Sequence, residues 1–331
     1  MNNVANMYYA LIWLVIKAEG TGNKKNIYMA TKSLLIVLLA AFFSTSILAQ
    51  EAGDIPNGVL ANRVSIAPRN VLSMFRQAGM DPVNHELTES EKEKVEKAFA
   101  TLPPLHQKIL KEHLLSISFM DNMPNTALTS PVATTSATKM FNITFRAGIL
   151  SETISEWATW KENTCFERST DPEFEISIDA GELDAIQYVL LHEATHVVDA
   201  VLTITPHPND SEELVDPTPF TKNIWYTMNV PTEAFINPLL EKTRFRSGNT
   251  VAISSAPEIY GALQETPFVS LYGMASWFED IAELVTIYHL TDKLDQPFRI
   301  SVRKHNREVA SFEPMKNKLV KKRLKQIKTF Y

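Results

Sequence analysis

Two histidines and a glutamate form the pattern in this chain that most clearly points to chemistry. They stand in His192-Glu193-Ala194-Thr195-His196, within a strongly apolar segment. If that segment is a helix, a spacing of four places both imidazoles one turn apart on the same face, where they can bind one metal ion. Glu193 can then take a proton from a metal-bound water without being a ligand itself. The pattern predicts a metal-dependent hydrolytic site with Glu193 as the general base.

A third protein ligand must come from elsewhere in the chain. Metzincins place a glycine and a histidine after the motif, at the positions that Asp199 and Leu202 occupy here, so that class is excluded. Glu279 and Glu283 remain as candidates, because a spacing of four puts them one turn apart on a second predicted helix. Two neutral histidines and one carboxylate suit zinc better than they suit cations that prefer oxygen ligands. We therefore expect the cofactor to be Zn²⁺.

Two segments, roughly 189–200 and 270–285, resemble the gluzincin metallopeptidases, in particular the catalytic domain of anthrax lethal factor. The resemblance rests on the His-Glu-x-x-His motif followed by Asp199, and on Tyr272-Gly273 seven residues before Glu279, with Ala282-Glu283 after it. It implies a zincin-like α+β fold in which Zn²⁺ is bound by His192, His196 and Glu279. It also implies that Tyr272 points its hydroxyl into the active site, where it would stabilise the developing oxyanion or the leaving group.

The acidic residues of both segments leave alternatives. Ser276 and Glu279 have the spacing of a capping box, in which Glu279 would bond back to the helix backbone and Glu283 would be the ligand. We favour Glu279 as the ligand and Glu283 as the outer hydrogen-bonding partner that such sites require. Asp199 is expected to be either another outer partner or a simple polar residue at the end of a helix.

The segments that must position these residues predict an α+β fold, with a small mixed sheet packed on the helix of the motif and on the second ligand-bearing helix. Apolar periodicity, capping signals and turn signals predict an N-terminal helical pair over 88–120 with a break at Pro103-Pro104, helices over 182–202, 268–290 and 317–330, strands over 141–149 and 174–178, and a hairpin over 297–312 that turns at His305-Asn306. Residues 121–136 are expected to be a connecting loop, and 203–267 a lid or substrate-shaping insert. The strand over 174–178 is expected to bind an extended peptide by strand addition.

The first 49 residues are interpreted as an N-terminal extension and a signal peptide. From Met29 the order is a basic residue, a short apolar stretch and a small-residue cleavage region that ends at Ala49. The apolar stretch is too short to span a membrane, so we expect a mature form with no stable membrane span, secreted or periplasmic; an uncleaved anchor is the alternative. The rest is expected to comprise an N-terminal helical region, 50–136, and a zinc metallopeptidase catalytic region with a basic C-terminal helix, 137–331.

The composition is that of a globular protein, with 45% hydrophobic and 21% charged residues in a chain of 331, and it excludes a disordered or coiled-coil chain. The net charge of -6 argues against nucleic acid as a partner. The basic run that starts at Lys316 is expected to be a solvated helix face. The single cysteine, Cys165, is expected to be a small, half-buried apolar residue, and the other histidines, His207 and His289 among them, to be structural.

Together these features predict a secreted zinc metallopeptidase whose partner is a peptide or protein substrate. Two other classes stay open. One is a zinc hydrolase of a non-peptide amide, which would use the same metal chemistry. The other is a non-hydrolytic, zinc-binding secreted protein, whose sign would be the loss of Glu193 or Tyr272; both residues are present. No oligomeric state is predicted.

Overall fold

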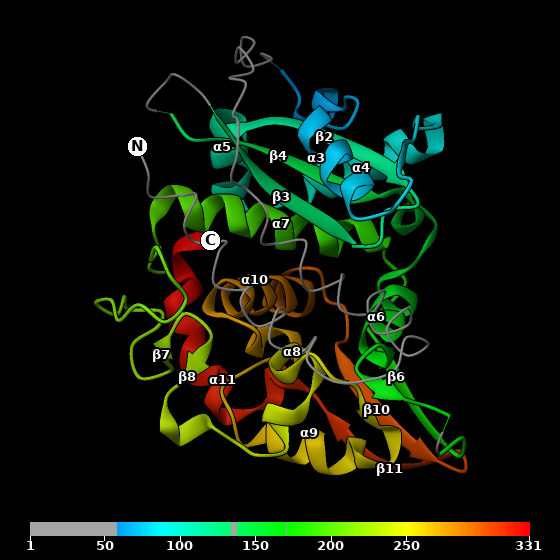
Figure 1. Ribbon diagram of the computed structural model, residues 1–331, viewed down its shortest axis with the longest axis vertical. Coiled ribbons are helices and arrows are strands. Elements are labelled where there is room, and N and C mark those ends of the chain that lie inside the picture. The colour runs from blue at the N-terminus through cyan, green and yellow to red at the C-terminus, as the bar shows by residue number, and fades with distance from the viewer. Residues whose placement is uncertain (1–57, 134–137, 170) are drawn as a thin grey trace.

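The computed structural model describes residues 58–133, 138–169 and 171–331. Over these residues the chain is α+β, as expected, and its strands form small separate sheets. One of these sheets has four strands. Figure 1 shows it at one end of the molecule, with helix α7 (Ala185–Leu202) beneath it and α10 (Trp277–Tyr288) beneath α7. A three-stranded sheet and shorter helices occupy the other end. The predicted signal peptide and its cleavage site lie outside the described residues.

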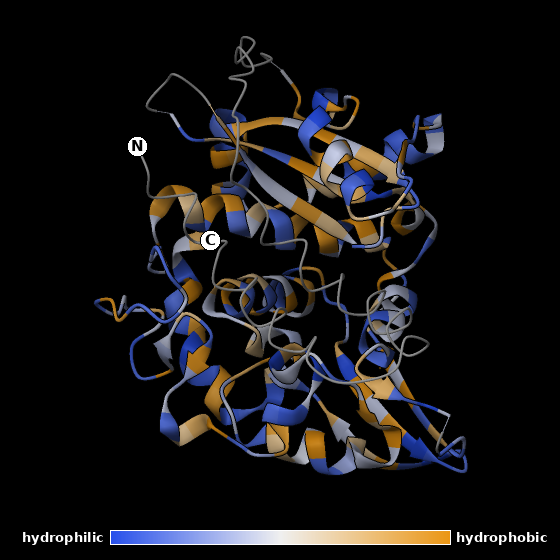
Figure 2. Ribbon diagram, in the orientation of Figure 1, coloured by the Kyte–Doolittle hydropathy of each residue, from blue (hydrophilic) through white to orange (hydrophobic). Residues whose placement is uncertain are grey.

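The four-stranded sheet is mixed, with the order β1 (Val83–Asn84), β2 (Leu114–Asp121), β4 (Met140–Arg146), β3 (Ala127–Val132). β2 and β4 are parallel, whereas β1 and β3 run antiparallel to their neighbours. Along β4 every residue but the last is buried, as expected of a central strand whose two faces are both covered. Figure 2 shows hydrophobic residues along these strands. β3 is the outermost strand on its side of the sheet within the described residues.

Two predictions for the N-terminal region are wrong. The helical pair is present as α4 (Glu89–Ala100) and α5 (Pro104–His113), and the capping box before α4 is confirmed, but residues 114–120 belong to strand β2 instead of a helix. The expected loop over 121–136 contains strand β3. Pairing with β4 makes both segments strands, and this long-range effect is invisible in local propensity. The N-terminal region is therefore not purely helical, and the expected boundary at 136/137 falls between two paired strands.

Helix α7 packs against α4, α5, α10 and β3. Because α7 has neighbours on several sides, its own apolar residues point in all directions instead of forming one stripe, and almost all of the helix is buried. It begins three residues later than the predicted 182 and ends before Thr203, which adopts the left-handed backbone conformation with φ 54°.

Helix α10 begins at Trp277 and not at the predicted 268. The hydroxyl of Ser276 accepts a hydrogen bond from the backbone N–H of Glu279 and so caps the helix. The residues before the cap include a single 3-10 turn, η7 (Tyr272–Met274). The second predicted helix is therefore a turn, a cap and a helix of twelve residues.

The three-stranded sheet has the order β11 (Arg307–Phe312), β10 (Arg299–Lys304), β6 (Phe174–Asp179), and each neighbouring pair is antiparallel. The predicted hairpin is confirmed. Its two turn residues, His305 and Asn306, have φ values of 47° and 62°, which is the conformation that a two-residue hairpin turn requires.

The outer edge of β6 is covered by helix α6 (Ile154–Asn163). Thr159 Oγ1 accepts a hydrogen bond from the N–H of Ile178 at 2.8 Å, and Asn163 Nδ2 donates to the carbonyl of Ile176 at 3.0 Å. These side chains occupy the main-chain groups that an added strand would need. The prediction that this strand binds a peptide by strand addition is therefore wrong.

The remaining elements fill the ends of the molecule. The expected insert over 203–267 contains only short elements: β7 (Trp225–Thr227), β8 (Val230–Pro231), η4 (Glu233–Phe235), η5 (Leu240–Lys242), α8 (Arg244–Ser247), β9 (Val251–Ala252), η6 (Ile253–Ser255) and α9 (Ala256–Gln264). The predicted basic C-terminal helix is α11 (Lys318–Arg323) followed by the 3-10 helix η10 (Leu324–Phe330). None of the described helices combines the length and the hydrophobicity needed to cross a membrane. The other elements are η2 (Leu60–Arg63), α3 (Arg69–Gln77), η3 (Ala147–Ser151), β5 (Phe166–Glu167), the π-helical turn η8 (His289–Lys293) and η9 (Pro314–Lys316).

Candidate metal centre

Helix α7 presents His192 and His196 on one face, as their spacing predicts. The ring centroids are 4.9 Å apart and the rings are nearly perpendicular, at 84°. Together with Glu193 the two histidines form a group in which one possible ligand atom of each residue lies within 4.8 Å of the others. This cluster could hold a metal ion.

Glu279, at the start of α10, faces both histidines. Its Oε2 atom lies 3.0 Å from His192 Nε2 and 3.6 Å from His196 Nε2. In a tetrahedral zinc site with ligand bonds of roughly 2.0–2.1 Å, neighbouring ligand atoms are separated by ~3.3 Å. The two distances lie on either side of that value, so Glu279 Oε2 has the separation from each histidine nitrogen that a shared zinc ion requires.

The capping box considered for this helix is only half formed. Ser276 accepts the hydrogen bond from the Glu279 backbone, but the Glu279 carboxylate contacts the histidines. The cap therefore fixes the backbone of Glu279 while its side chain points across to α7. Burial alone would raise the pKa of this carboxyl, but the two histidines outweigh that effect and hold it well below its ordinary value.

Glu283 stands one turn further along α10, behind His192. Its Oε1 lies 3.1 Å from His192 Nδ1 and accepts a hydrogen bond from Tyr188 at 3.1 Å, and its Oε2 accepts one from Ser270 at 2.7 Å. Burial opposes ionisation, but the charge of Lys161 and the contact with His192 bring the pKa of Glu283 to about 2. His192 thus has one carboxylate on each ring nitrogen, which is the arrangement in which an outer carboxylate orients a histidine ligand.

The charge balance of this cluster favours a cation. Burial lowers the pKa of His192, but the carboxylates of Glu279 and Glu283 more than compensate and raise it to about 9. The surroundings of the imidazole therefore stabilise positive charge at this point. A divalent metal ion supplies such charge, so the donor set and its electrostatics both fit a metal.

Lys161 of α6 is a further residue of this region that the sequence reasoning missed. Its ammonium lies 3.6 Å from Glu283 Oε1 and 3.7 Å from the centre of the Tyr272 ring. It is thus paired with the carboxylate behind His192 and stacked on the expected oxyanion donor. No local pattern marks a lysine on a short helix for this position, because the long side chain of Lys161 reaches Glu283 and Tyr272 only once α6 has packed against α7 and β6.

Tyr272 lies on the turn before α10 and is packed between aromatic rings. Its ring is 5.8 Å from that of His192, at 21°, and 4.8 Å from that of Phe245 in α8. Burial, followed by the negative charges of Glu279 and Glu193, raises the pKa of the Tyr272 hydroxyl well above its ordinary value. The residue is therefore a protonated hydrogen-bond donor at neutral pH, beside the candidate metal ligands.

Glu193 is held from the opposite side by the sheet. Thr129 of β3 donates a hydrogen bond to Glu193 Oε2 at 2.6 Å. The sequence gives no sign of this contact, because the composition of residues 121–136 is that of a loop. A threonine at the edge of a sheet is ordinary, and only the pairing of β3 with β4 brings Thr129 to α7.

Asp199 is used elsewhere in the structure. Its Oδ1 accepts a hydrogen bond from the N–H of Thr205 at 2.7 Å and its Oδ2 one from the Thr205 hydroxyl at 2.6 Å, while His207 Nε2 lies 3.8 Å away. The carboxylate thus fastens the chain that leaves α7. This corrects the expectation that Asp199 supports a ligand, and it corresponds to the alternative of a polar residue at the helix end.

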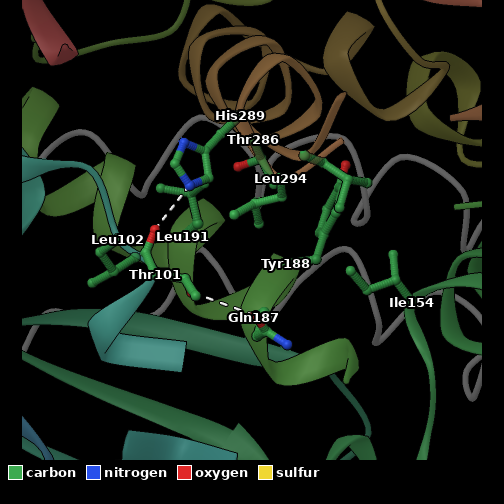
Figure 3. Close-up of a pocket in the computed structure, with 10 residues that line it drawn as sticks. Thr101, Leu102, Ile154, Gln187, Tyr188, Leu191, Thr286, His289 and Leu294 are labelled. Carbon is green, nitrogen blue, oxygen red and sulfur yellow. Dashed lines mark hydrogen bonds between the residues drawn. The ribbon is translucent and has the colours of Figure 1, made fainter. Parts of the chain in front are cut away.

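His289 and Cys165 make contacts that hold the fold together and lie outside the cluster. His289 donates to the carbonyl of Thr101 at 2.8 Å, at the wall of a small cavity between α7 and the end of α10 that Figure 3 shows. That cavity, of about 10 Å³, has room for about one water molecule and cannot hold a substrate. Cys165 is fully buried, more than expected, and burial raises the pKa of its thiol.

Comparisons of the chain with protein-family models, with curated proteins and with solved structures found no match. The functional assignment therefore rests on the chemistry and geometry of the cluster itself.

Proposed function

We propose that this chain is a zinc-dependent metallopeptidase of the gluzincin type with a zincin-like fold. One observation carries the proposal. A single oxygen of Glu279 lies within 3.6 Å of the Nε2 atoms of both His192 and His196, whereas the carboxylate of Glu193 is held by Thr129. Three candidate ligands are thus gathered around one point, and one carboxylate stays available beside them as a base.

The chemistry of each residue follows from its position. Zn²⁺ bound by His192, His196 and Glu279 would polarise a water molecule and the scissile carbonyl. Glu193 would accept the proton of the attacking water and deliver it to the leaving amine. Tyr272, kept protonated by its raised pKa, would donate a hydrogen bond to the oxygen on which negative charge develops.

The edge of β3 suits the main chain of an extended substrate. The N–H of Arg146 in β4 donates to the carbonyl of Thr126 at 2.9 Å, so the main-chain groups of residues 126, 128, 130 and 132 face β4. Those of Ala127 and Thr129 then face the outer edge, beside Glu193. We propose that a peptide pairs with this edge, where main-chain hydrogen bonds supply affinity independently of sequence.

The test is digestion of a peptide library by the purified chain, with three protein samples compared. The wild-type chain should contain about one zinc and cleave peptides. Glu193→Gln should keep the zinc and lose turnover, because every ligand stays in place. His192→Ala should lose both. Full peptide cleavage by Glu193→Gln, or unchanged zinc in His192→Ala, would refute the assignment.

We also propose that the protein is exported, secreted or periplasmic, after cleavage behind Ala49. The proposal rests on the order of basic, apolar and small residues from Met29. N-terminal sequencing of the protein from soluble extracytoplasmic fractions should give Gln50 as the first residue. Recovery of membrane-bound protein that still carries residues 1–49 would establish the anchored alternative.

A further inference from the structure

The side chain of Thr129 connects the edge strand of the four-stranded sheet to the candidate general base. Its hydroxyl donates to Glu193 Oε2 at 2.6 Å, and this Thr129 Oγ1 atom also lies 3.4 Å from the main-chain carbonyl oxygen of Glu193. At this distance the hydrogen bond is short for one between two oxygen atoms. One oxygen of the carboxylate is thus held by the sheet, and Oε1 remains for another partner.

The backbone of Thr129 points in a different direction from its side chain. Thr129 is opposite Ile143 in β4, in a position where the main-chain N–H and carbonyl point away from the neighbouring strand. The residue therefore offers its main chain to the outer edge of the sheet and its hydroxyl to α7. Main-chain direction and side-chain face both alternate every two residues along a strand, so Ala127 shares this arrangement, but only Thr129 has a hydroxyl to offer the helix.

We propose that Thr129 is a positioning residue for Glu193, and that it links the edge where substrate docks to the base that acts on the water. The inference rests on the proposed function. A glutamate side chain has three rotatable bonds, so an isolated carboxylate would sample several orientations. The hydrogen bond from Thr129 fixes Oε2 and so restricts the carboxylate, and such restriction raises the fraction of productive encounters.

The experiment compares variants that separate the hydroxyl from the shape of the side chain. Thr129→Val replaces the hydroxyl by a methyl group of similar size. Thr129→Ser keeps the hydroxyl and loses the methyl group. Ser130→Ala, one residue along the same strand with its side chain on the opposite face, serves as the matched control. Zinc content, kcat and KM are measured for each on a peptide that the wild-type chain cleaves.

Thr129→Val should lower kcat by about tenfold, with KM within about twofold of wild type and full zinc content, because only the orientation of the base changes. Thr129→Ser should restore most of kcat, and Ser130→Ala should match the wild type. If Thr129→Val does not fold, Thr129→Ala is expected to show the same loss of kcat. Wild-type kcat in Thr129→Val, or failure of Thr129→Ser to restore it, would overturn the inference.

The outcomes also separate this inference from the proposed function. If the wild-type chain cleaves peptides and Glu193→Gln does not, the proposed function stands, and the kcat of Thr129→Val decides the inference alone. If the wild-type chain loaded with zinc cleaves no peptide, the proposed function fails, and the positioning role fails with it.

Discussion

The two glutamates of α10 offer a direct way to test which of them binds the metal. Glu279→Gln and Glu283→Gln each replace a carboxylate by an amide of the same size. The two positions are one turn apart on one helix, so the changes are matched in charge and in backbone context. They differ in the histidine nitrogens that they face, since Glu279 contacts both Nε2 atoms and Glu283 the Nδ1 atom of His192.

The expected magnitudes follow from that difference. Removing an outer carboxylate typically weakens metal binding by about 10- to 100-fold, which corresponds to about 1.4–2.7 kcal/mol. Glu283→Gln should fall within this range, because its effect reaches the metal only through the orientation of His192. Glu279→Gln should lose more than about 100-fold, because it removes a charged ligand from the site itself.

The assay is a competition titration with a zinc indicator at neutral pH, with circular dichroism recorded on the same samples. Glu258→Gln, an exposed glutamate on α9, is the control and should bind zinc like the wild type. A folded Glu283→Gln that binds zinc more weakly than Glu279→Gln would refute the assignment. It would show that Glu283 is the ligand, as the capping-box alternative requires.

Two further predictions concern α6, which packs beside the cluster. Lys161→Met should lower the free energy of unfolding in urea by about 1–3 kcal/mol, because it removes the cation that lies between Glu283 and the Tyr272 ring. An unchanged free energy of unfolding would contradict this role. Glu162 is buried, its Oε1 accepts a hydrogen bond from Tyr260 at 2.5 Å, and burial raises its pKa to about 7. As the pH rises from 4.5 to beyond 7, the wild type should therefore lose about 3 kcal/mol of unfolding free energy relative to Glu162→Gln. Urea unfolding of both proteins at pH 5 and pH 8 measures this loss, and a constant difference between them would show that Glu162 titrates normally.

Local patterns predict the parts of this molecule whose geometry is set within one element. The helix of His192 and His196 follows from apolar residues and a spacing of four, and the hairpin at His305 and Asn306 from its turn residues. Each of these depends on neighbours only a few residues away in the chain. For the same reason the sequence predicts the face that α7 presents, without predicting what lies opposite that face.

Residues that reach the cluster from other elements could not be predicted in this way. Thr129 is 64 residues from Glu193 in the chain, and Lys161 comes from a helix that the sequence reasoning did not single out. β2 and β3 are strands because β4 lies between them, so neither segment is recognisable as a strand from its own residues. The errors and the missed residues share one cause, the dependence of sheet formation on distant pairing.

The basic C-terminal run also contributes to the candidate site, through the start of α10. The basic C-terminal run is a solvated face for its exposed lysines, but Arg323 is buried and binds Asp280 through two hydrogen bonds, of 2.8 and 2.6 Å. Trp225 donates a third to the same carboxylate at 2.8 Å. Asp280 directly follows Glu279, whose backbone is capped by Ser276. Breaking a buried pair of this kind costs about 3–5 kcal/mol, since the remaining charge is left without a partner. The first turn of α10 is therefore fixed on both sides of Glu279, and the C-terminal helix holds a candidate metal ligand in place without touching it.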